Sequence, residues 1–280
     1  EADEIYAKNS GTWELVFAAF TAGSVQTLSS GSGTFTVPDG ANAIHIQASV
    51  GGGGGAMRGI DYDKAGGESA GAGGGSGAYV SDKVFTVTTG ETISYSVGSS
   101  GANGTGTYSG SAGGGASTTI SGSTTGSIFT LTGGGGASAS GGGVQGPLRS
   151  NTAGTAGSNT ISGSVITSGN FRDTDGATKS VTTLTSGPVG TFNQSGNGAV
   201  GGNNGNCGGD NCQIGGSTGA ASYSGNVSGG AGSPVGSSTN GSAGTRGSGG
   251  GGGGAQYGPG STQGGSGGTG EIQYRFLRVN

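Results

Sequence analysis

The chain has 280 residues, of which 75 are Gly, while only 29% are hydrophobic and 9% are charged. This composition excludes a large side-chain core, and a formal net charge of −4 leaves no basic surface for nucleic-acid phosphates. No run of apolar residues approaches membrane-spanning length, so we expect no membrane insertion.

The N-terminal part, residues 1–32, is predicted to be an attachment segment that combines a β-hairpin with a linker. Residues 5–8 and 12–17 flank the turn Asn9-Ser10-Gly11, which is the arrangement of a hairpin. Residues 18–33 are then predicted to form the linker. The chain begins at Glu1, and we expect it to be a fragment or processed product of a longer protein.

The glycine-rich part, residues 33–280, is predicted to be a second domain, organised around the stretch AIHIQASVGGGGGA at residues 43–56. Residues 43–50 alternate apolar and polar side chains, which predicts a half-buried β-strand with His45 on the polar face. Five glycines follow directly at residues 51–55. Glycine loses more backbone entropy on ordering than any other residue, so an ordinary strand would not continue into this run.

Other short strands are predicted along the same domain. They are marked by alternating or clustered apolar residues at 34–37, 79–87, 92–97, 118–120, 127–132 and 272–277. Glycine clusters lie between most of them, whereas residues 144–191 are rich in Ser, Thr and Asn. A strand at the C-terminus indicates that the glycine clusters are held between structured segments.

The glycine clusters do not fit the common glycine-rich structures. Collagen needs Gly at every third position and abundant Pro, but here the glycines form blocks and the chain has 5 Pro. A flexible linker joins domains and does not recur between the strands of one domain. The remaining structure is a bundle of extended, three-residue-per-turn glycine helices that hydrogen-bond to one another.

The predicted fold is therefore all-β and irregular, with almost no α-helix. A small antiparallel β scaffold is expected to fix the register of a packed bundle of polyglycine-II helices. Ala and Ser within the glycine runs are expected on the outer faces, where a side chain does not block a neighbouring helix.

Three stretches carry a resemblance to a known family: TFTVPDGANAIHIQASVGGGGGA, GGGSGAYVSDKVFTVTTGETISYSVGSSGANG and GGGGGGAQYG before a final strand. Together they resemble the glycine-rich receptor-binding tip domains of bacteriophage tail fibres, similar to T-even-type tail fibre adhesins, over about residues 33–280. The opening IYAKNSGTWELV resembles modules found just upstream of such tips. The chain lacks the N-terminal attachment pattern of the T-even adhesin.

The resemblance implies a virion protein at the distal tip of a tail fibre, outside the cell. Its implied partners are a bacterial outer-surface protein or glycan and an upstream fibre segment. The resemblance is compatible with two oligomeric states, a homotrimer and a capping monomer. The alternatives are a structural subunit of a virion or cell-surface fibre without receptor specificity, and a polysaccharide depolymerase.

Receptor contacts are expected where larger side chains interrupt the glycine, because loops between rigid helices carry the specific groups. Tyr is suited to recognition, as it combines area with a hydroxyl and few rotors. The candidates are Met57, Arg58, Ile60, Tyr62, Tyr108, Leu148, Arg149, Phe171, Arg172, Phe192, Tyr223 and Tyr257. About half of them are expected to anchor their own loops instead.

No residue pattern indicates an enzyme, a cofactor or a metal site. His45 has no partner evident in the sequence and is predicted to be structural or solvent-facing. Asp61/Asp63 and Asp173/Asp175 are interpreted as solvated loop charges, with an ion site as the minor alternative. Cys207 and Cys212 are close enough for a disulfide, and two free thiols are an equal alternative.

Overall fold

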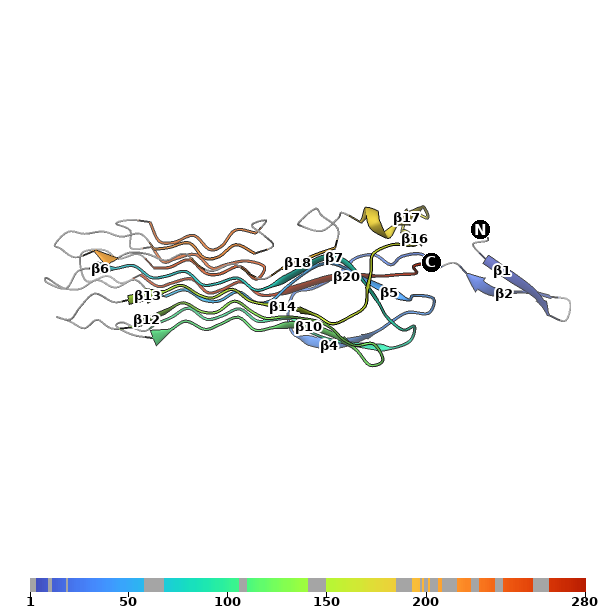
Figure 1. Cartoon of the computed structure of the whole chain (residues 1–280), viewed down its shortest axis with the longest axis horizontal. Helices are drawn as coiled ribbons and strands as arrows, with labels where there is room; N and C mark the ends of the chain where they lie inside the picture. The colour runs from blue at the N-terminus through green and yellow to red at the C-terminus, as the bar shows by residue number, and fades with distance from the viewer. Residues whose placement is uncertain are drawn as a thin grey trace.

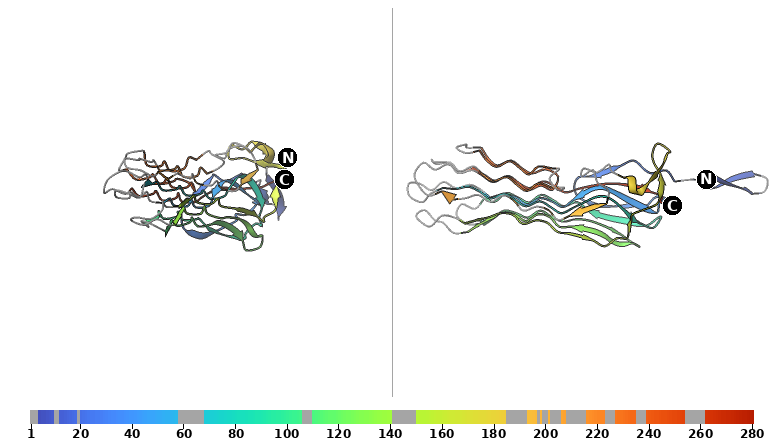
Figure 2. Two further views of the ribbon diagram at one scale, coloured as in Figure 1. Left: turned by 60° about the vertical axis from the view of Figure 1, so that its left-hand side comes forward. Right: turned by 45° about the horizontal axis from the view of Figure 1, so that its top comes forward.

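A computed structural model describes most of the chain. The described residues are 4–9, 12–18, 20–57, 68–105, 110–140, 150–184, 193–196, 198, 201, 206–207, 216–222, 227–234, 239–253 and 262–280. Within them the structure is nearly all β, and the helical element is one 3₁₀ turn, η1 (Val181–Thr183). Two sheets form a scaffold, and the glycine-rich runs extend side by side from it as gently waving segments (Figures 1 and 2).

The predicted N-terminal hairpin is confirmed. Strands β1 (Glu4–Asn9) and β2 (Thr12–Ala18) pair in antiparallel fashion, each slightly longer than expected. The predicted linker over residues 18–33 is wrong in part, because β3 (Gln26–Leu28) is the edge strand of a sheet. It pairs with β20 (Glu271–Leu277), a partner almost 250 residues away that no local pattern could indicate.

The first sheet has the order β15-β7-β5-β20-β3, with β18 also paired to β7. Its centre is β5 (Ala43–Val50), between β7 (Tyr79–Thr86) and β20. The short strands are β15 (Val165–Ile166) and β18 (Gln194–Gly196).

The second sheet has the order β14-β11-β10-β8-β4. Its strands are β4 (Ser32–Thr36), β8 (Thr92–Ser96), β10 (Thr118–Gly122), β11 (Gly126–Leu131) and β14 (Asn159–Ile161). A small third sheet has the order β13 (Ser150–Thr152), β12 (Ser138–Ser140), β9 (Gly110–Ser111). Two further pairs are β16 (Asn170–Arg172) with β17 (Thr178–Ser180), and β6 (Glu68–Ser69) with β19 (Asn206–Cys207).

The main core lies between the two sheets. Ile44, Ile46 and Phe85 from the first sheet pack with buried residues of the second, including Phe129, whose ring centroid lies 6.2 Å from that of Phe85. The core position predicted for Ile44 and Ile46 is therefore confirmed. Each such side chain contributes about 2 kcal/mol of hydrophobic stabilisation. Ala48 and Val50 were predicted on the same face, and this is wrong, because the pairing register shifts between Ile46 and Ala48 and both residues pack with Tyr79 in a separate cluster.

The opposite face of β5 was predicted to be polar and solvated, and this is wrong. Hairpin β16–β17 and η1 cover it, forming a second apolar cluster in which Phe171, Val181 and Leu184 pack with Val84. His45 is fully buried as a result. The covering segment comes from the Ser- and Thr-rich region, where the sequence shows no strong apolar alternation.

Residues 51–57 continue from β5 without a break and show hydrogen bonding with a period of three. The N–H groups of Gly51, Gly54 and Met57 all donate to residues 72–78, at 2.8–3.0 Å. The N–H groups of Gly52 and Gly55 donate to residues 113–116, and those of Gly53 and Ala56 donate to residues 265–268. A helix with three residues per turn presents successive groups to three different neighbours in this way.

The carbonyl groups of the same run follow the same period with three further neighbours. Gly52 and Gly55 accept from residues 134–137, Gly53 and Ala56 from residues 101–104, and Gly54 and Met57 from residues 250–253. Three donor neighbours and three acceptor neighbours surround the run, which is hexagonal packing. We call this bundle of hydrogen-bonded runs the glycine lattice; its pattern is that expected of packed polyglycine-II helices.

The lattice depends on the absence of side chains. A Cβ on Gly53 would lie 1.9 Å from the Ser248 carbonyl oxygen, and one on Gly54 would lie 2.0 Å from the Gly135 carbonyl oxygen. Backbone atoms on all sides leave no flexible group that could move away. Glycine is therefore required there by close approach rather than by an unusual φ angle.

The expectation that Ala and Ser occupy outer faces holds only for outer runs. Ser99 and Ala102 are exposed, but Ala56, Ala72 and Ser76 are fully buried. Ala72 joins Ala112, Ala137, Ala139 and Met57 in a small apolar cluster inside the lattice. A methyl group is thus accepted at interior positions whose Cβ points between runs rather than at a carbonyl group.

Two neighbouring glycines in one outer run give a matched test of the lattice. A Cβ on Gly115 would lie 2.2 Å from the Gly52 carbonyl oxygen, whereas the nearest heavy atom to a Cβ on Gly114 is 3.5 Å away. We expect Gly115→Ala to lower the free energy of unfolding by about 3 kcal/mol and Gly114→Ala to change it by less than about 0.5 kcal/mol. Chemical denaturation of both variants measures the difference. Equal, small effects would contradict close packing at Gly115.

Candidate functional site

The glycine lattice has two different ends. At one end its runs continue into the scaffold strands, as residues 51–57 do from β5. At the other end Met57 donates to Ala72, Gly253 donates to Met57 and Ala112 donates to Ala137, each at 2.8–3.0 Å. These hydrogen bonds, together with the packing of Met57 against Ala72, Ala112 and Ala137, place all five residues at one level, which we call the distal end. Strand pairs β6–β19 and β9–β12–β13 also lie there, on the left in Figure 1.

Several of the predicted contact residues come in the sequence between described residues that lie at the distal end. Arg58, Ile60 and Tyr62 follow Met57 directly; Tyr108, Leu148, Arg149 and Tyr257 lie in the segments 106–109, 141–149 and 254–261. All seven residues lie outside the described residues. The residues that flank their segments are at the distal end, so segments far apart in the sequence begin and end on one face.

Two further predicted contact residues, Tyr223 and Phe192, have described flanking residues on the scaffold side. Tyr223, itself outside the described residues, lies between Ser222 and Val227, and Val227 packs against Val50 and Tyr79 at the scaffold. Phe192, also outside them, precedes Asn193, whose N–H donates to the Asp82 carbonyl oxygen. The sequence alone does not show at which end of the lattice the residues flanking a segment lie, because this depends on how the glycine runs pair with one another.

Met57 and Phe171 were predicted as receptor contacts, and their burial corrects this. Met57 is fully buried, and a Cβ on Gly104 would lie 2.3 Å from its sulfur atom, so its side chain packs on bare backbone. Phe171 is 2% exposed and anchors hairpin β16–β17 to the scaffold. Arg172 next to it is half-buried, and its carbonyl oxygen accepts from Ala22 at 2.8 Å.

The two cysteines and the first pair of aspartates lie largely outside the described residues. Cys207 lies in β19 at the distal end, and its side chain and the whole of Cys212 are outside the described residues, as are Asp61 and Asp63. Among the residues described, no three His, Cys, Asp or Glu side chains gather as metal ligands. None of the described helices has the length and apolar character needed to cross a membrane.

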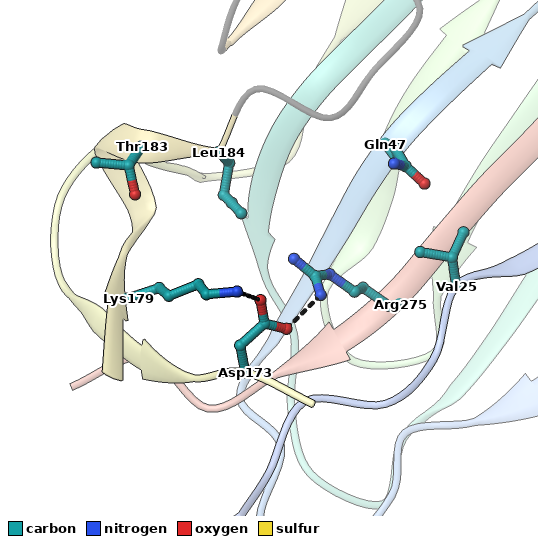
Figure 3. A pocket seen from close by; sticks show the side chains of 7 residues that line it. All are labelled: Val25, Gln47, Asp173, Lys179, Thr183, Leu184 and Arg275. Carbon is teal, nitrogen blue, oxygen red and sulfur yellow. Dashed lines mark hydrogen bonds and ion pairs between the residues drawn. The ribbon is translucent and has the colours of Figure 1, made fainter. Parts of the chain in front are cut away.

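A second feature is a pocket on the covered face of β5, with a volume of about 340 Å³ (Figure 3). Asp173, Lys179 and Arg275 contribute its charged groups, and Val25, Gln47, Thr183 and Leu184 complete its lining. We call it the scaffold pocket. Val25 is 40% exposed and stands at its edge.

Asp173 holds the charged groups of the scaffold pocket together. Its Oδ1 accepts from Arg275 Nη1 and its Oδ2 from Lys179 Nζ, both at 2.6 Å. Burial by itself would raise the pKa of Asp173, but hydrogen bonds from Lys179, Thr174 and Arg275 outweigh it and lower the pKa. The interpretation of this carboxylate as a solvated loop charge is therefore wrong, since its hairpin folds over β20. It is right for Asp175, whose side chain is 57% exposed.

His45 extends this network into the scaffold. Arg275 Nε donates to His45 Nδ1 at 3.3 Å, and His45 Nε2 lies 3.3 Å from Asp82 Oδ1. Burial lowers the pKa of His45, and this outweighs the opposing hydrogen bond with Asp82. The neutral ring then accepts from Arg275 at one nitrogen and donates to Asp82 at the other. The expectation of a structural His45 fits this arrangement, whereas the solvent-facing alternative is wrong.

The pKa of His45 gives a prediction for stability against pH. Below about pH 6.5 the unfolded chain binds a proton that the folded chain does not, so the free energy of unfolding falls with decreasing pH. The expected slope is at most about 1.4 kcal/mol per pH unit. His45 is the single histidine of the chain, so His45→Asn, which keeps an acceptor for Arg275, should remove the slope between pH 5 and 6.5. Denaturant titrations at several pH values measure it; the same slope in both proteins would contradict the assignment.

Comparison with known proteins identifies the domain type. No curated protein matches the chain. A family model described as a glycine-rich domain matches residues 27–277, which run from within β3 to the end of β20 and include the whole glycine lattice. The chain therefore belongs to the family of glycine-rich domains.

Proposed function

We propose that this protein is the receptor-binding tip of a bacteriophage tail fibre. In this proposal it lies at the distal tip of the virion's fibre and recognises a bacterial outer-surface protein or glycan. The scaffold side faces the upstream fibre, and the distal end of the glycine lattice faces the host. The protein acts by binding and not as an enzyme.

One observation carries the proposal. The lattice register brings the flanks of segments 58–67, 106–109, 141–149 and 254–261 to one end of a rigid bundle. Binding residues are commonly placed on loops held by a rigid scaffold. A lattice of this kind can hold such loops with hardly any side chains of its own, which leaves loop sequences free to vary with the host.

The composition of these segments supports recognition. They contain Tyr62, Tyr108, Tyr257 and the cations Arg58 and Arg149, whereas the runs between them are mostly Gly, Ala and Ser. Tyr and Arg are enriched among the residues that dominate binding energy at interfaces. The contrast in composition is expected if the runs supply support and the segments supply contacts.

The direction of the chain supports an attachment at the scaffold. The N-terminal side enters through β3, which pairs with the C-terminal strand β20, so both ends of the domain lie at the scaffold. The hairpin β1–β2 is also on this side, away from the distal end (Figure 1). An upstream fibre segment joined there would project the distal end outward, whether the tip is a trimer or a capping monomer.

Tyrosines in segments whose described flanking residues lie at the two ends of the lattice offer a matched test. We expect Tyr62→Ala and Tyr257→Ala to lower the adsorption rate of the parent phage at least about ten-fold, as loss of a central aromatic contact does. Tyr223→Ala, whose flanks lie at the scaffold end, should leave adsorption unchanged. Melting temperatures of the three purified variants control for folding.

Two outcomes would contradict the proposal. Normal adsorption with both distal tyrosines replaced would remove the distal end from recognition. Assembly of the purified chain into filaments without binding to host cells would instead favour a structural fibre subunit.

A further inference from the structure

The structure assigns a second binding site, the scaffold pocket, to a sugar that carries a carboxylate. This site is separate from the distal end and does not depend on the proposed receptor contacts. The hydrogen-bonding capacity, the charge and the arrangement of the lining side chains support this assignment.

Arg275 provides the main unused donors. Its side chain is 10% exposed, and it uses Nε toward His45 and Nη1 toward Asp173. The Nη2 amino group keeps two N–H donors that have no acceptor among the described residues, and in Figure 3 the guanidinium faces the open space beside Leu184 and Gln47. A buried guanidinium group with free N–H donors favours a charged acceptor, because carboxylates match its planar geometry.

Lys179 adds a second cation. Its Nζ lies 2.6 Å from Asp173 Oδ2 and 3.2 Å from Asp175 Oδ2, which leaves one of its three N–H donors. Asp173 already accepts from Arg275, Lys179 and the Thr174 N–H, so its own acceptor capacity is largely used. The three charged lining residues carry a net charge of +1, and Asp175 beside Lys179 balances it. The unused hydrogen-bonding groups that the pocket offers a ligand are therefore mainly donors, while its net charge is close to neutral.

The remaining lining distinguishes a sugar from a simple anion. Val25 and Leu184 supply apolar surface on two sides of the pocket (Figure 3). Thr183 Oγ1 donates to the Ser180 carbonyl oxygen, which leaves its lone pairs for a ligand hydroxyl. Small-molecule sites typically combine such apolar surface with a few polar groups in about 300–1,000 Å³. At about 340 Å³ the pocket accommodates one pyranose ring with its carboxylate toward Arg275.

The test compares two sugars that differ in one group. Calorimetric titration of the full chain with galacturonate and with galactose is expected to give a dissociation constant at least ten-fold lower for galacturonate. The advantage should decrease as the salt concentration rises, since a charge-assisted contact supplies it. Equal binding of the two sugars, or no binding of either, would overturn the assignment.

A substitution at the rim locates the binding without disturbing the charge network. Val25 is exposed, so Val25→Trp should fold normally, cover the pocket and raise the dissociation constant for galacturonate at least ten-fold. Thr36→Trp, on the exposed face of the other sheet, places the same side chain away from the pocket and should have no effect. Galacturonate binding unaffected by Val25→Trp would overturn the site.

Discussion

The structure depends on satisfying backbone hydrogen bonds where there are no side chains to bury. Residues 51–57 donate to three neighbouring runs and accept from three others, and residues 247–253 do the same. Each hydrogen bond contributes only about 1 kcal/mol net, while ordering one residue costs about 1–2 kcal/mol. An isolated glycine run therefore stays disordered. Order requires many runs whose backbone N–H and C=O groups hydrogen-bond to one another at the same time.

The scaffold makes that simultaneous order attainable. Strand β5 leads directly into residues 51–57, and residues 70–78 lead directly into β7, its partner in the sheet. The register of each run is thus inherited from a strand whose apolar side chains are fixed in the core. The glycine lattice in turn fixes the distal end, so a small conventional core determines the position of loops far from it. The charge network around Asp173 and Arg275 stabilises the face of β5 that the core between the sheets leaves uncovered.

The sequence predicted those parts whose cause is local. Ile44 and Ile46 alternate with polar residues, so β5 and its core face were predictable, and the glycine blocks excluded collagen and pointed to packed extended helices. Burial of His45 and Asp173 was not predictable, because it depends on hairpin β16–β17 folding over β5 from 130 residues away. The only local signal was Asp173-Thr174-Asp175-Gly176, a turn-forming stretch between Phe171 and Lys179 that could have indicated a hairpin. Burial of Met57, and the placement of Ser222 and Val227 at the opposite end of the lattice from Gly253, follow from the pairing of the runs with one another, which has no signature in a single run.

Amide hydrogen exchange at individual glycines measures whether the glycine runs are ordered by hydrogen bonds between their backbones. If the lattice orders bare backbone, the amides of Gly52, Gly53, Gly54 and Gly55 should exchange as slowly as those of Ile44 and Ile46 in β5. Gly114, on the outer face with no hydrogen-bond acceptor for its N–H among the described residues, should exchange quickly. Exchange of residues 52–55 at the rate of an unstructured chain, with β5 still protected, would show that the glycine runs are linkers and would contradict the account.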